Sequence, residues 1–159
     1  MLRPFIGWLA VAAGVVVLDQ ATKWAILGAL RFGEVRAVGS FFNLVLTFNR
    51  GAAFSFLSDA SGWQRVFFIG IALAASAIIV ALLLRNLREP AFCAGLALIL
   101  GGALGNLWDR IDLGYVVDFL DFHAFGYHWP AFNAADSAIT VGAALLIIDS
   151  FRPGRKRGA

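Results

Sequence analysis

The stretches VFFIGIALAASAIIVALLL (Val66–Leu84) and PAFCAGLALILGGALGNLW (Pro90–Trp108) decide the fold of this 159-residue chain. Each has 19 residues and contains no Lys, Arg, Asp or Glu. About 20 apolar residues in a helix, at a rise of roughly 1.5 Å per residue, cross the hydrocarbon core of a bilayer. Both stretches are therefore predicted to be transmembrane helices, joined by the short, positively charged turn Arg85–Glu89.

The composition of the whole chain also indicates a membrane protein. Hydrophobic residues make up 60% and charged residues only 14%, with a mean hydropathy of +0.80, whereas globular domains contain about 25% charged residues. This excludes a soluble domain, because so small a fold could not bury that much apolar surface. The single cysteine, Cys93, excludes an internal disulfide and a cysteine-rich metal site.

Two further spans are predicted, and both carry ionisable groups. The first apolar pattern continues past Asp19 and Lys23, and the last span is long enough only if it includes Asp136. Each such group costs about 2.5–3.5 kcal/mol on insertion scales, so it usually has a partner or a function. We expect one domain, residues 1–159, with spans at approximately 5–28, 65–84, 90–108 and 131–149.

The distribution of Lys and Arg predicts the orientation of these spans. The N-terminus, the Arg85–Glu89 turn and the basic tail at residues 152–157 are expected on the cytoplasmic side. The tail follows a span directly, so it is interpreted as a topology anchor and not as a nucleic-acid-binding segment. Segments 31–65 and 109–130 then face outward, although Arg31, Arg36 and Arg50 in the first of them depart from the rule.

A β element is predicted between the first two spans. Phe41–Phe48 (FFNLVLTF) is rich in β-branched and aromatic residues, which favours a strand, and nearby glycines would end it. The expected fold is therefore an all-α membrane protein of four transmembrane helices with a small β platform on the extracytoplasmic side.

Polar residues in and near the spans fall at one depth, close to the predicted outer interface, while the cytoplasmic half is nearly bare. They are Asp19, Lys23, Asn106, Asp109, Arg110, Asp118, Asn133 and Asp136. Asp19 and Lys23 stand four residues apart on one helix face, which predicts a structural ion pair.

Two carboxyls that face each other in a low-dielectric pocket share a proton. One can activate a water while its protonated partner polarises a scissile carbonyl. The chain offers no serine in a nucleophile elbow and no His-x-x-x-His spacing. From the residues alone, Asp118 and Asp136 are the candidate pair, with Asp19, Asp109 and Asp121 as rivals.

Five blocks, in order, resemble the lipoprotein signal peptidase (signal peptidase II) family. The blocks are DQATK (Asp19–Lys23), NRGAAFS (Asn49–Ser55), GGALGNLWDR (Gly101–Arg110), VVDF (Val116–Phe119) and FNAADS (Phe132–Ser137). Together they are highly specific, and the match runs through most of the chain, from Asp19 to Ser137. Segment Phe122–Trp129 matches nothing in that pattern, and its role stays open.

The resemblance implies an aspartic endopeptidase with Asp118 and Asp136 as its catalytic dyad and with no metal or cofactor. Its substrate would be a diacylglyceryl-modified prolipoprotein, cut before the lipidated cysteine near the outer face of the bacterial cytoplasmic (inner) membrane. It also implies membrane lipid and cyclic lipopeptide inhibitors as partners, and no nucleic acid. Residues that match positions lining or supporting the family's site are Asn49, Asn106, Arg110, Asn133, Asp19 and Lys23.

Several interpretations stay open. Asp109 and Arg110 either cap a helix end or, in the case of Arg110, contact the substrate or Asp19. Asn49 and Arg50 form either a simple turn or part of a binding segment that covers the peptide. The alternative function is an ion or proton transporter that uses intramembrane carboxylates, but a relay needs ionisable groups through the whole membrane depth.

Five residues outside the predicted site also receive interpretations. Asp112 and Asp121 are predicted to be solvated loop charges, and His123, His128 and Trp129 to lie in the interfacial belt.

Overall fold

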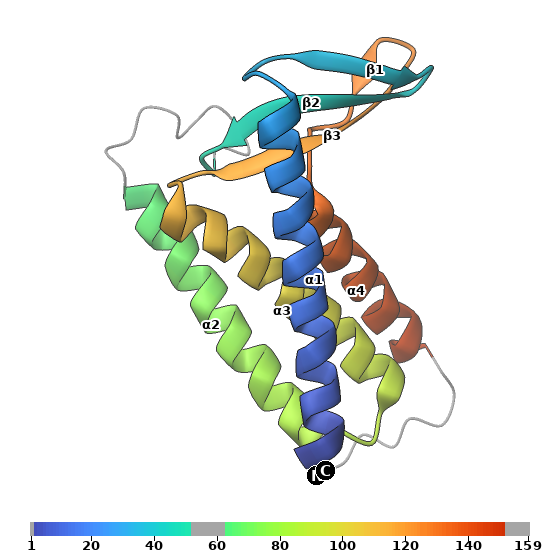
Figure 1. Ribbon diagram of the computed structural model, residues 1–159. Helices are drawn as coiled ribbons and strands as arrows, with labels where there is room; N and C mark the ends of the chain where they lie inside the picture. The colour runs from blue at the N-terminus through green and yellow to red at the C-terminus, as the bar shows by residue number, and fades with distance from the viewer. Residues whose placement is uncertain (1, 52–62, 152–159) are drawn as a thin grey trace.

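The computed structural model describes residues 2–51 and 63–151. In these residues, helices stand beneath a small sheet (Figure 1). The helices are α1 (Leu2–Ala29), α2 (Trp63–Arg85), α3 (Pro90–Asp112) and α4 (Ala134–Ser150), and the strands are β1 (Val35–Gly39), β2 (Phe42–Asn49), β3 (Val116–Ala124) and β4 (Tyr127–His128). The predicted binding residues 52–55 and the basic tail at 152–157 lie outside the described residues.

Three of these helices, α1, α2 and α3, are long and apolar enough to cross a membrane. The predicted spans 5–28, 65–84 and 90–108 fall inside them. Helix α4 has 17 residues and begins at Ala134 instead of 131, because the side chain of Asn133 caps it by accepting a hydrogen bond from the Asp136 N–H (3.0 Å). The protein is mostly helical, with three membrane-capable helices and a small antiparallel sheet.

Helix α3 packs against all three other helices, whereas α2 makes extensive contacts with α3 alone. Glycines on α3 allow the close approach. A Cβ at Gly105 would lie 2.6 Å from the Asp19 Oδ2 of α1, and one at Gly102 would overlap the Ala135 carbonyl of α4. Small residues at such crossings let helix backbones meet. Away from the sheet, α1, α2 and α3 share a buried apolar cluster of Ala12, Ile79, Leu83, Cys93, Leu96 and Leu100.

The sheet is antiparallel in the order β1-β2-β3-β4. The predicted strand Phe41–Phe48 is confirmed as β2. One sheet face packs on the end of α1, where Val117 and Phe119 of β3 join a buried cluster with Ile26. Successive residues of a strand point to opposite faces, so Asp118 projects from the other face of β3.

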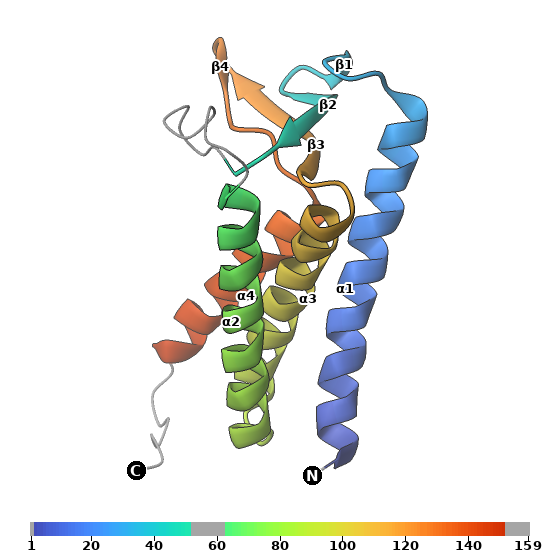
Figure 2. The same cartoon turned by 90° about the vertical axis from the view of Figure 1, so that its left-hand side faces the viewer.

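Segment Phe122–Trp129 contains the β3–β4 hairpin, which projects from the sheet (Figure 2). Its two-residue turn, Phe125–Gly126, has positive φ at both positions, 51° and 80°. Such turns match the twist of a hairpin but favour Asn or Gly. The left-handed backbone at Phe125 costs roughly 1–2 kcal/mol. Because the Phe125 side chain is fully exposed, no burial of apolar surface within the described residues offsets this cost.

Candidate active site

Asp118 and Asp136 reach the site from different elements. Asp118 projects from β3 opposite Thr47 of β2 and is 2% exposed. Asp136 stands in the first turn of α4. Burial, and after it the charge of Asp136, raise the pKa of Asp118 to about 7, although Asn49 and Asn133 act in the opposite direction. The Asp136 carboxyl is therefore close enough to influence the ionisation of Asp118.

Two side-chain amides join these carboxyls. Asn133 Nδ2 donates to Asp118 Oδ1 (2.7 Å) and to Asn106 Oδ1 (3.2 Å). Asn106 Nδ2 in turn donates to Asp136 Oδ1 (2.7 Å). Asn133 is completely buried. The predicted site residues Asn106 and Asn133 thus form a hydrogen-bonded bridge between the two aspartates.

The orientation of both amides is fixed by donors to their oxygen atoms. Asn106 Oδ1 accepts from Lys23 Nζ (3.0 Å), and Asn133 Oδ1 accepts from the Asp136 backbone N–H (3.0 Å). An amide carries one acceptor oxygen and one donor nitrogen. With each oxygen held by a donor, each nitrogen faces a carboxylate.

Lys23 lies in a buried ion cluster and is 1% exposed. Its Nζ is 2.8 Å from Asp19 Oδ2 and 2.8 Å from Asp109 Oδ2. The predicted Asp19–Lys23 pair is confirmed, and Asp109 joins it. The Asp19 Oδ1 accepts from the Ala135 N–H (2.9 Å) and Asp109 Oδ2 from the Val117 N–H (3.1 Å). The cluster therefore connects α1 and α3 with the backbone beside each member of the candidate pair.

Arg110, near the end of α3, lies close to the aspartates. Its Nη1 donates to the Asn106 carbonyl (3.2 Å), and its charge interacts with Asp136 and, less strongly, with Asp118. Its guanidinium carbon stands 5.2 Å from the centre of the Phe68 ring. Asp19, the other partner considered for Arg110, is occupied by Lys23.

The end of β2 supplies Asn49 and Arg50, both exposed. Asn49 lies two residues beyond Thr47, which is paired with Asp118, and its side chain is near enough to that aspartate to act to lower its pKa. Its Oδ1 accepts from the Gly51 N–H (2.8 Å). The third amide of the site is therefore oriented in the same way as the other two.

The structure corrects the prediction that Asp121 is a solvated loop charge. It is 6% exposed and accepts from Asn43 Nδ2 (2.8 Å), while His128 Nδ1 lies 2.9 Å from it. Desolvation acts to raise the pKa of Asp121, but these hydrogen bonds outweigh it and hold the pKa below its usual range. The β2–β3 register, which places Asn43 opposite Asp121, explains the difference. Asp112 is exposed, as predicted.

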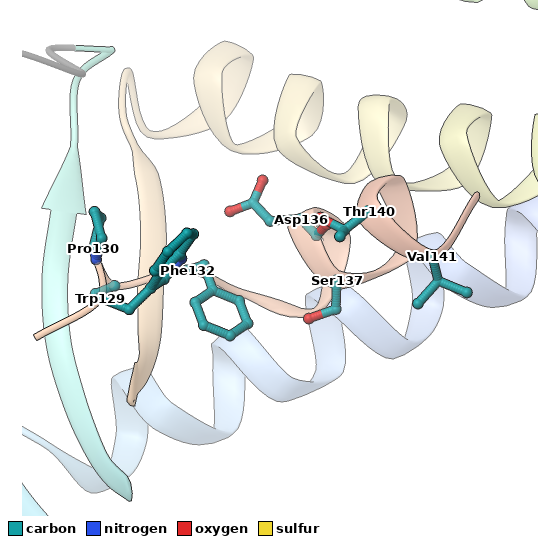
Figure 3. Close-up of a pocket in the computed structure, with 8 residues that line it drawn as sticks. Trp129, Pro130, Phe132, Asp136, Ser137, Thr140 and Val141 are labelled. Atoms are coloured by element: carbon teal, nitrogen blue, oxygen red, sulfur yellow. The ribbon is translucent and has the colours of Figure 1, made fainter. Parts of the chain in front are cut away.

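A cavity of about 560 Å³ opens beside Asp136 (Figure 3). Trp129 and Phe132 lie at one end, and Thr140 and Val141 extend it along α4. Its lining is mainly apolar apart from the carboxyl and two hydroxyls. Among residues 2–51 and 63–151, no group of three or more His, Cys, Asp or Glu side chains is arranged to hold a metal ion.

Sequence reasoning did not find Gln20 or Phe68. Gln20 Nε2 donates to Asp109 Oδ1 (2.8 Å), and Phe68 stacks beneath Arg110. Gln20 follows Asp19 directly inside a quoted block, so its position was a usable signal. Phe68 is one of 15 phenylalanines and lies in an apolar span, where nothing in the sequence distinguishes it.

Comparisons with known proteins agree on one family. The model of the family described as Signal peptidase (SPase) II matches residues 11–152. A lipoprotein signal peptidase of Ralstonia nicotianae is 58% identical over 149 residues, which are 94% of this chain and 86% of that protein. One from Paraburkholderia phymatum is 55% identical over 152 residues, 96% of this chain and 90% of the relative.

Solved structures of similar fold include a bacterial membrane enzyme determined by the in meso method. It is 34% identical, with a TM-score of 0.83 over 92% of this chain and 94% of that chain. A second structure, also described as a bacterial membrane enzyme, is 33% identical, with a TM-score of 0.82 over 96% and 93% of the two chains.

Proposed function

Because the chain belongs to the signal peptidase II family, we propose that it is an aspartic endopeptidase that removes signal peptides from diacylglyceryl-modified prolipoproteins. The cut falls before the lipidated cysteine. The observation that carries this proposal is the amide bridge, which links Asp118 through Asn133 and Asn106 to Asp136.

The two carboxyls act as one proton-sharing unit. The ionised member takes a proton from a water, and the resulting hydroxide attacks the scissile carbonyl while the protonated member donates to the carbonyl oxygen. The tetrahedral intermediate then collapses. The C–N bond breaks as the proton taken from water passes to the leaving cysteine nitrogen, and one hydroxyl proton of the intermediate returns to the carboxyl that donated it. A pKa of about 7 for Asp118 supports this, because a shared proton is then available near neutral pH.

The surrounding groups orient and balance this pair. The amides of Asn106 and Asn133 donate to the carboxyls, and the Asn49 amide lies beside Asp118, before substrate arrives, which avoids reorganisation during the reaction. Arg110 adds a positive charge near both aspartates. Lys23 keeps the Asn106 amide turned toward Asp136.

The membrane setting follows from the family and the apolar helices. We infer that α4, extended by residues 131–133, is a fourth span, so that residues 1–159 form one domain with both termini in the cytoplasm. The dyad then lies near the outer face of the bacterial inner membrane. The apolar cavity beside Asp136 supports a lipid-bearing substrate, because acyl chains can remain next to α4 while the peptide meets the dyad. The same cavity suits cyclic lipopeptide inhibitors.

Cleavage of a diacylated lipobox peptide by the protein in nanodiscs tests the proposal. Asp118→Asn and Asp136→Asn should each abolish cleavage while the thermal unfolding profile remains cooperative. Asp112→Asn is the matched control, because it removes an exposed carboxyl at the end of α3, and it should cleave at the wild-type rate. Retained cleavage in both dyad variants would refute the assignment.

A further inference from the structure

Helix α2 carries no aspartate, yet its first turns touch two of the groups that surround the dyad. Arg65 Nε donates to the Arg110 carbonyl (2.7 Å), and its Nη2 donates to the Ile111 carbonyl (2.6 Å). These carbonyls lie at the C-terminal end of α3, where they lack partners within the helix. Arg65 thereby fixes the start of α2 against the end of α3.

One turn further along α2, the Phe68 ring contacts both the Arg110 guanidinium and Gly51. The Arg110 guanidinium is positioned over its ring at 5.2 Å. Gly51, which follows β2, packs against the same ring so closely that a Cβ there would overlap the ring edge. Gly51 also has a φ of 94°, which side chains other than glycine rarely adopt.

The contact between Gly51 and the Phe68 ring is linked to Asp118 through the side-chain amide of Asn49. The Gly51 N–H donates to Asn49 Oδ1 (2.8 Å), so the Asn49 nitrogen is free to face Asp118. The strand register supports this geometry, since Asn49 shares a sheet face with Thr47, the direct partner of Asp118. Displacing the Phe68 ring would release Gly51 and with it the orientation of Asn49.

We propose that Phe68, held in place by Arg65, is a positioning residue that sets Asn49 against Asp118 and Arg110 against Asp136. This rests on the proposed aspartic mechanism. The ring touches no reacting atom, and it acts by fixing the donor and the cation that flank the dyad. Moving or removing the Phe68 ring therefore disturbs the surroundings of both Asp118 and Asp136.

The test measures cleavage by Phe68→Ala in nanodiscs across pH 5–9. We expect kcat to fall at least tenfold with KM within twofold of wild type, because the carboxyls and not the cavity are affected. Asp118 also loses the interaction with Asn49 that favours its ionised form. The alkaline limb of the kcat/KM profile should therefore move to higher pH by at least half a unit, which a purely structural defect would not cause.

Matched variants define the outcome. Leu73→Ala removes a half-exposed apolar side chain five residues further along α2 and should leave kcat and the pH profile unchanged, while Phe68→Tyr should keep both at their wild-type values. If Phe68→Ala does not fold, Phe68→Leu keeps apolar volume without a flat ring and should show the same pH change. A lower melting temperature without any pH change would overturn the positioning role. If Asp118→Asn is inactive but Phe68→Ala is fully active, this inference alone is overturned. If the dyad variants Asp118→Asn and Asp136→Asn are active, the proposed mechanism is overturned.

Discussion

Replacing Asp118 by asparagine should stabilise the folded protein at alkaline pH even though it abolishes cleavage. The pKa of Asp118 rises from 3.8 to about 7, and each pKa unit corresponds to about 1.36 kcal/mol. Holding this carboxyl ionised inside the fold therefore costs roughly 4 kcal/mol. Asparagine has a similar shape and no charge to desolvate.

The sign follows from proton linkage. The folded protein binds the Asp118 proton more tightly than the unfolded chain does, so the cost is absent below about pH 4 and grows as pH rises. It reaches its full value near pH 7 and is then constant. The difference in unfolding free energy between Asp118→Asn and wild type should rise by up to roughly 4 kcal/mol between pH 4 and pH 8.

Unfolding of both proteins in the same detergent, followed by tryptophan fluorescence at each pH, measures this difference. Titrating groups other than Asp136, which is coupled to Asp118, are common to both proteins and cancel. Asp112→Asn serves as the control, since its exposed carboxyl should give no comparable trend. A difference that is flat with pH, or a variant less stable than wild type at pH 8, would contradict the reasoning.

Three further outcomes are expected. Lys23→Met should lower the unfolding free energy by about 3–5 kcal/mol, because Asp19 and Asp109 remain buried without their cation; adding Asp19→Asn should recover part of the loss in the same unfolding assay, and full stability of Lys23→Met alone would count against the cluster. Phe125→Gly should raise the unfolding free energy by about 1 kcal/mol, since glycine adopts the left-handed turn without strain; a lower midpoint would show that Phe125 has a partner. A strong chelator should leave the peptide cleavage rate unchanged, and loss of activity restored by zinc would exclude the dyad mechanism.

Much of the helical framework was predictable because apolar stretches and membrane thickness fix it. Val66–Leu84 and Pro90–Trp108 lie inside α2 and α3 as expected. The Asp19–Lys23 pair follows from helical spacing. The arrival of Asp109 beside Lys23 does not, because it depends on how closely α1 and α3 cross, which Gly105 permits.

The polar network around the aspartates was only partly predictable. The blocks identified Asn106 and Asn133, but which atom of each amide faces which carboxyl depends on donors that come from distant segments. The burial of Asp121 depends on a strand register that no local pattern specifies. Phe68 acquires its position only when the end of β2 meets α2.

Helix α3 packs against three neighbours, whereas α2 makes extensive contacts with α3 alone. The helices are therefore arranged around α3 and do not form a closed ring. Helices α2 and α4 do not pack extensively against each other, so the bundle can be approached from the side between them. The proposed lipid-anchored substrate, diffusing in the plane of the bilayer, would reach the bundle between α2 and α4 without separating a tightly packed pair of helices. Access from the lipid phase then requires no separation of α3 from the helices packed against it.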